Sequence, residues 1–119
     1  MNTPKNTSTN TYTPTTGPWK DAEPGVTRRL VAAGNTMMAM EVRFEPGAEG
    51  ARHSHPHEQL SRLLAGRLTF YLGDDERELG AGDVIVIPGG LEHGVLALEE
   101  SLLIDVFSPL REDLLEALR

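Results

Sequence analysis

The chain has no cysteine, few basic residues and no long apolar run. With no cysteine in 119 residues, it can form no disulfide and offers no thiolate to a metal. Its 18 acidic side chains outnumber 11 basic ones, which gives a net charge of -7. Proteins that bind nucleic acids or anionic membrane surfaces usually present a basic face, so neither partner is expected.

No apolar stretch reaches the roughly 20 residues that a membrane-spanning helix needs. The N-terminus also lacks the apolar core of a signal peptide. We therefore expect a cytoplasmic protein. A chain of 119 residues is long enough for one hydrophobic core but short for two.

Residues 1–18 differ in composition from the rest of the chain. Thr, Asn, Ser and Pro dominate there, and apolar residues are almost absent. Such a segment cannot bury enough apolar surface to offset the entropy lost on ordering. The sequence therefore predicts a polar tail over residues 1–18 and one folded domain over residues 19–119.

Residues 19–119 show the patterns of short β-strands separated by turns that contain Gly or Pro. Apolar residues alternate with polar ones from Thr36 to Glu45, as on a strand with one buried face. Residues 83–87 and 102–107 are apolar on both faces, which predicts strands buried between two layers. About nine short strands with regular turns indicate an all-β sandwich or barrel. Only 111–118 predicts a helix, because its leucines recur at helical spacing.

Three histidines and a glutamine predict a mononuclear metal site. His53 and His55 are two residues apart, so on a strand they project from one face, although exposed alternation also produces such a pair. Pro56 permits the bend that would bring Gln59 to the same point, and a Pro-x-Gly turn precedes His93. Imidazoles with one oxygen suit a divalent Mn, Fe, Co, Ni or Zn ion. No residue is assigned to an organic cofactor.

His57 has the same parity as the ligand pair. Because the bend at Pro56 intervenes, we expect its side chain to turn toward the mouth of the cavity. We expect a surface role for this residue, and contact with the metal or the substrate is the alternative.

The spacing of these residues is similar to the two motifs of the cupin family. The first motif is a glycine, His-x-His, an acid and a second glycine, and it is matched by Gly47, His53, His55, Gln59 and Gly66. The second motif is matched by Gly82, Pro88, Gly90 and His93. Gln59 replaces the usual Glu, and Ala97 replaces the final Asn. The resemblance implies a single-domain jelly-roll barrel, also called a double-stranded β-helix, with a short C-terminal helix.

A narrower resemblance is to the KdgF-type pectin-degradation cupins. It includes the run from His53 to Gln59, the C-terminal segment 105–113, and the opening residues Trp19, Pro24-Gly25 and Arg28-Arg29. That resemblance implies an enzyme that opens the ring of 4,5-unsaturated galacturonate to 5-keto-4-deoxyuronate. It also implies one divalent metal ion held by the three histidines and Gln59. Asp105, Phe107 and Arg111 are then expected as the catalytic residues of the pocket.

The chemistry of these residues agrees with an anionic, sugar-like substrate. Neutral ligands leave the charge of a divalent ion uncompensated, which favours an anion. Asp105 lies in an apolar strand, where a carboxylate is costly unless it is paired or functional, so it is the candidate acid–base. Arg111 can bind a carboxylate bidentately. The alternatives are a salt bridge for Asp105, core packing for Phe107 and a solvated position for Arg111.

Other activities are compatible with the same ligand set. They are a lyase similar to the manganese cupins with hydroxynitrile-lyase activity, an oxygen-activating dioxygenase, and a non-catalytic sugar-binding cupin.

Outward-facing leucines, among them Leu60 and Leu64 or Leu96 and Leu98, predict a homodimer in which a second copy covers them.

Overall fold

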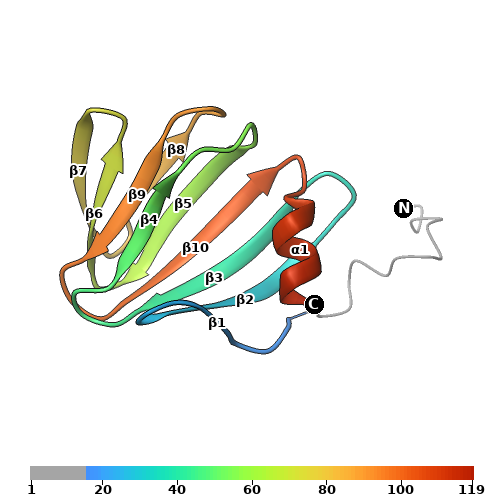
Figure 1. Cartoon of the computed structure of the whole chain (residues 1–119), viewed down its shortest axis with the longest axis horizontal. Coiled ribbons are helices and arrows are strands. Elements are labelled where there is room, and N and C mark those ends of the chain that lie inside the picture. The colour runs from blue at the N-terminus through green and yellow to red at the C-terminus, as the bar shows by residue number, and fades with distance from the viewer. Residues whose placement is uncertain (1–15) are drawn as a thin grey trace, which may run out of the picture.

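The structure, a computed structural model that describes residues 16–119, contains two antiparallel β-sheets that face each other (Figure 1). In spatial order, the larger sheet comprises β1 (Lys20–Glu23), β2 (Val26–Ala33), β3 (Met38–Phe44), β10 (Ser101–Ser108), β5 (Glu58–Ala65) and β8 (Val84–Ile87). The smaller sheet comprises β4 (Glu49–His53), β9 (His93–Ala97), β6 (Arg67–Leu72) and β7 (Asp75–Gly80). The predicted all-β jelly-roll barrel is confirmed, with ten strands in the described range where about nine were expected. Most of the predicted tail, residues 1–15, lies outside the described residues.

The core lies between the inward faces of the two sheets. Along β3, buried residues alternate with more exposed ones, as the sequence predicts, and Met38 and Phe44 are among those buried. Phe70 and Leu68 of β6 contribute from the opposite sheet. Burying such side chains stabilises a fold by about 1.5–3 kcal/mol each, so these two faces hold the sheets together.

The outer face of β8 contradicts the prediction that residues 83–87 are buried between two layers. Val84 and Val86 are 49% and 58% exposed. The reason is topological, because β8 is the last strand of the larger sheet and pairs only with β5. In β10 the side chains of Leu102, Ile104 and Val106 are likewise only partly buried, on the outer face of the same sheet.

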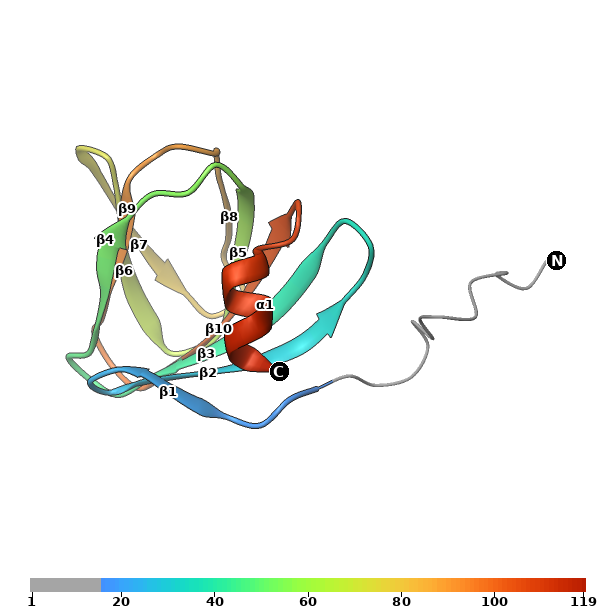
Figure 2. The same ribbon diagram turned by 45° about the vertical axis from the view of Figure 1, so that its right-hand side comes forward.

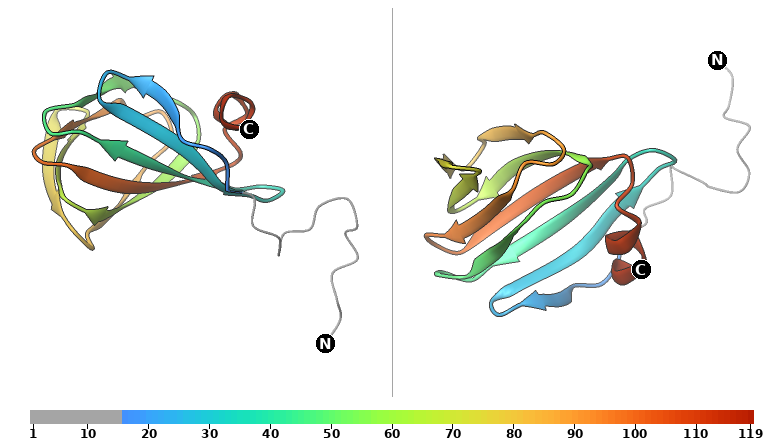
Figure 3. Two further views of the ribbon diagram at one scale, coloured as in Figure 1. Left: turned by 90° about the horizontal axis from the view of Figure 1, so that it is seen from below. Right: turned by 45° about the horizontal axis from the view of Figure 1, so that its top comes forward.

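The predicted C-terminal helix is confirmed as α1 (Glu112–Leu118), which packs against β2 (Figures 2 and 3). Seven residues are too few for a helix that is stable alone. Its leucines enter the core, and the Lys20 ammonium donates to the carbonyls of Ala117 and Arg119 at 3.0 and 2.7 Å. This cation therefore stabilises the C-terminal end of α1, whose last turn has no basic residue. Within residues 16–119, no helix is long and apolar enough to cross a membrane.

The outer face of β2 and β3 binds the chain segment that precedes β1. The guanidinium groups of Arg29 and Arg43 lie 4.6 and 4.2 Å from the ring centre of Trp19. Arg29 also forms an ion pair with Glu41 at 2.6 Å. On strand β2, Arg29 therefore has an outward, structural role.

Candidate metal centre

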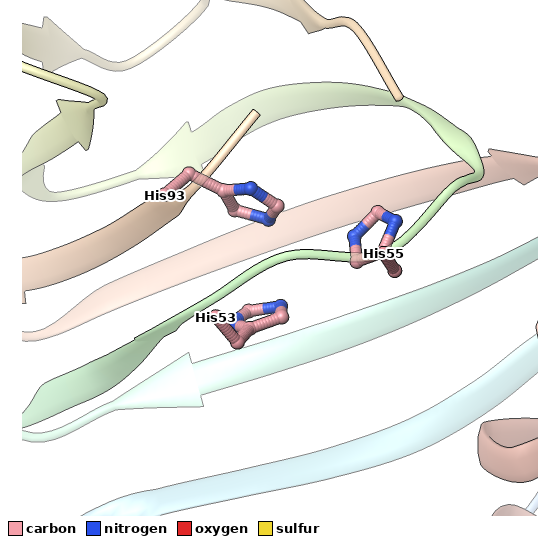
Figure 4. Close-up of side chains that lie close together, drawn as sticks. All are labelled: His53, His55 and His93. Atoms are coloured by element: carbon pink, nitrogen blue, oxygen red, sulfur yellow. The ribbon is translucent and has the colours of Figure 1, made fainter. Parts of the chain in front are cut away.

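His53, His55 and His93 point toward one another inside the barrel (Figure 4). His53 ends β4 and His93 begins β9, and the two residues are directly paired in the strand register. His55 lies in the irregular segment that follows β4. One ligand nitrogen from each residue lies within 4.8 Å of the other two, so the group could hold a metal ion.

Hydrogen bonds to the backbone orient all three imidazoles. Each Nδ1 lies 2.9 to 3.1 Å from a carbonyl oxygen, which can only accept a hydrogen bond. The acceptors for His53, His55 and His93 are Ala51, His57 and Leu91, respectively. Each Nδ1 therefore carries the proton in the neutral ring, and each Nε2 keeps its lone pair. This is the usual outer-shell arrangement of metal-binding histidines.

The burial of the site favours neutral imidazoles. Burial lowers the pKa of His93 and of His55 below the ordinary value, and the positive charge of Arg111 lowers both further. The Nε2 atom of His93 is buried and has no hydrogen-bond partner among the described residues. A buried lone pair without a donor is costly, and a metal ion would satisfy it.

Gln59 brings an oxygen to the same place. Its Oε1 lies 3.0 Å from Nε2 of His55, and both atoms are acceptors when the imidazole is neutral. Two ligands at right angles, each about 2.1 Å from an ion, are about 3.0 Å apart. A cation at this point would therefore convert an unfavourable pair of acceptors into two metal bonds. The Gln59 amide N–H donates to Oγ of Ser61 at 2.9 Å, which turns Oε1 toward the histidines.

Asp105 lies behind Gln59 on the neighbouring strand. It is paired with Ser61 in the strand register, and the Ser61 hydroxyl donates to Oδ1 of Asp105 at 2.6 Å. The carboxyl group is 4% exposed, and burial raises its pKa to about 6, although the bond from Ser61 opposes the shift. Sequence reasoning missed Ser61. Its inward parity with Gln59 and Leu63 was the available signal.

Phe107 and Arg111 line the same pocket as Asp105, His53 and His93. The ring of Phe107 meets His55 edge-on with centroids 5.7 Å apart, and the guanidinium of Arg111 lies 5.2 Å from the Phe107 ring centre. Arg111 precedes α1 and binds Asp113 at 2.9 Å. Its Nε is buried and has no hydrogen-bond partner within residues 16–119.

Arg28 belongs to the pocket, whereas His57 does not belong to the histidine group. Arg28 of β2 lines it, although sequence reasoning did not place this residue there. It shares an inward parity with Val26 and Leu30, and that pattern was visible in the sequence. His57 is not a member of the histidine group, and its ring centre lies 5.5 Å from that of His55.

We expect Asp105→Asn to stabilise the metal-free protein at alkaline pH. The pKa of Asp105 is higher in the folded protein than the ordinary 3.8, so this group makes folding less favourable as pH rises through the range from about 4 to about 6. A shift to about 6 corresponds to about 3 kcal/mol. Urea unfolding with a chelator present should show the variant more stable by up to that amount at pH 8, and by much less at pH 4. A variant less stable than the wild type at pH 8 would contradict a raised pKa of Asp105 in the folded protein.

Comparison with known proteins agrees with the fold. Residues 40–107 match the Cupin domain family. The chain is 36% identical over 100 residues to the pectin degradation protein KdgF of Dickeya dadantii (strain 3937). The aligned region covers 82% of this chain and 91% of that protein.

Two solved structures are similar to most of the chain. KdgF from Halomonas sp. has a TM-score of 0.78 at 41% identity, over 82% of this chain and 90% of that one. An RmlC-like cupin from Shewanella frigidimarina NCIMB 400 has a TM-score of 0.79 at 33% identity, over 82% of this chain and 88% of that one. With a family match over more than half of its length and the motif histidines brought together at one point, the chain belongs to the cupin family.

Proposed function

We propose that the protein opens the ring of 4,5-unsaturated galacturonate to give 5-keto-4-deoxyuronate. The observation that carries this proposal is that Asp105 and Arg111 line one pocket with His53 and His93, two of the three grouped histidines. An acid–base group, a cation and a metal-binding group are thus combined in a chain similar to a pectin degradation protein.

The proposed metal ligands are His53, His55, Gln59 and His93, for one divalent ion of the Mn, Fe, Co, Ni or Zn type. All four ligands are neutral, so the bound ion would keep its full charge toward the substrate. When bound, the metal supplies Lewis acidity and attraction for the oxygens of an anionic substrate. The orphaned Nε2 of His93 and the short distance between His55 and Gln59 support this donor set.

The reaction is an isomerisation that moves one proton. The C1 hydroxyl loses its proton as the bond between C1 and the ring oxygen breaks, which leaves an aldehyde at C1 and an enolate at C4–C5, and the enolate takes that proton at C4 to become a ketone at C5. No oxidant or other reactant is consumed. Asp105 is suited to hold and release this proton, because a pKa of about 6 keeps both of its forms accessible near neutral pH.

The other pocket residues bind and orient the substrate in this proposal. Ser61 donates to Asp105 and so fixes the position of the carboxyl group. Arg111 would bind the substrate carboxylate, for which its buried Nε is a free donor. Phe107, which is 1% exposed, would form an apolar wall that keeps the sugar ring in place.

Turnover of unsaturated galacturonate tests the proposal, since ring opening removes the absorbance of the conjugated enol. We expect Asp105→Asn to lower kcat by on the order of 100-fold or more with little change in KM, because it keeps shape but loses the acid–base group.

Arg111→Ala should chiefly raise KM, provided that its contact is equally strong in the ground and transition states.

Each outcome of this assay is informative. A metal-loaded wild type that leaves the absorbance unchanged would reject uronate ring opening and favour another cupin activity. Turnover that survives Asp105→Asn unchanged would remove Asp105 from the chemistry while leaving the reaction in place.

We also propose that the protein is a homodimer through the outer face of β5 and β8. Leu60 and Val86 are register partners there, and they are 39% and 58% exposed. Leu64 and Val84, at 41% and 49% exposure, extend the same apolar face. A second copy that binds symmetrically to this face would bury the patch.

Light scattering tests the assembly. We expect a mass of about twice the 13.0 kDa of one chain, and a smaller mass for Val86→Lys, since a buried lysine at a symmetric interface meets its own copy. Leu98→Lys is the matched control, because Leu98 is 44% exposed but lies outside the patch. A wild-type mass near 13 kDa at micromolar concentration would contradict the dimer.

A further inference from the structure

Arg28 occupies a position on β2 where the fold otherwise places apolar side chains. The flanking inward residues, Val26 and Leu30, are each 5% exposed. In the strand register Arg28 is paired with Val42, another buried residue of the core. Its side chain is therefore directed into the barrel, where Arg28 lines the same pocket as His53, His93 and Asp105.

Arg28 and Arg111 are two like charges in one partly buried pocket. Burial lowers the pKa of Arg28 and the positive charge of Arg111 adds to that shift, while the negative charges of Glu23, Asp113 and Asp105 oppose it. The Glu23 carboxylate accepts the backbone N–H of Ala51 at 3.1 Å. The Nε atoms of Arg28 and Arg111 are both buried without a hydrogen-bond partner among residues 16–119.

Carboxylates already lie near both guanidinium groups, but the two Nε donors remain unused within the described part of the chain and are available to an anion that enters the pocket. A buried donor without an acceptor is unfavourable, and a carboxylate that accepts from it removes this cost. Arg111 already donates one nitrogen to Asp113 at 2.9 Å, so it offers an incomplete fork to a ligand. A carboxylate has two oxygens with about four acceptor positions, enough for donors from both arginines.

We propose that Arg28 and Arg111 together bind the carboxylate of the substrate, and that Arg28 makes the pocket selective for uronates over neutral sugars. This inference rests on the proposed function, because it takes the substrate to be an unsaturated uronate. Arg28 is then a substrate-binding residue that comes from β2, at a distance in sequence from the motif residues and from the segment 105–111.

Arg28→Met and Arg29→Met form a matched pair of variants for the test. Both remove one positive charge from the same strand, but Arg29 is on the outer face, bound to Glu41 and stacked on Trp19. We expect Arg28→Met to raise KM for unsaturated galacturonate by on the order of 10–100-fold with a nearly unchanged kcat, as for a lost charge-assisted hydrogen bond. Arg29→Met should keep the wild-type KM and lower only the melting temperature.

Arg28→Lys keeps the charge but loses the planar fork, and it allows the test to proceed if Arg28→Met does not fold. Its KM should lie between those of the wild type and Arg28→Met.

Calorimetry with D-galacturonate and D-galactose gives a second readout, since these sugars differ only in the carboxylate. The wild type and Arg29→Met should prefer galacturonate, Arg28→Met should lose most of that preference, and Arg28→Lys should lose part of it.

The failure of this inference can be told apart from the failure of the proposed function. If the wild type turns over the substrate while the variants of Arg28 keep its KM, Arg28 has no role in binding and the proposed function stands. If the wild type shows no turnover, the proposed function is wrong, and the sugar preference decides the role of Arg28. A wild type without that preference, or variants of Arg28 that retain it, would overturn the inference.

Discussion

The site depends on three hydrogen bonds from imidazole Nδ1 atoms to backbone carbonyls. These bonds fix which nitrogen of His53, His55 and His93 carries the proton and turn the three free lone pairs toward one point. The pairing of β4 with β9 positions two of the rings, and the turn after β4 positions the third. The smaller sheet and the segment that follows β4 thus bring together three ligand nitrogens that could hold a cation.

The larger sheet supplies the groups that such a cation would act with. Gln59, Ser61 and Asp105 form a buried chain of hydrogen bonds across β5 and β10, and this chain orients the amide oxygen and the carboxyl group together. Burial of Asp105 costs stability at neutral pH, as its raised pKa shows. The apolar faces of both sheets offset that cost, so the pocket can combine a buried acid with the cations of Arg28 and Arg111.

Sequence patterns predicted those features that depend on local spacing. Alternation predicted the inward face of β3, the leucine spacing predicted α1, and the histidine spacing predicted the residues that converge. Features that depend on which strands become neighbours were not predicted. The exposure of Val84 and Val86 follows from the edge position of β8, and the role of Ser61 follows from its pairing with Asp105.

The central claim is that this arrangement binds one divalent ion, and a metal titration of the chelator-treated protein tests it most directly. We expect calorimetry to give one ion per chain for the wild type and for His57→Ala, whose histidine lies outside the group of three. His93→Ala should weaken binding by on the order of 100-fold or more, since it removes a buried ligand. A wild type that binds no divalent ion, or a His93→Ala variant that binds it as tightly, would contradict the account.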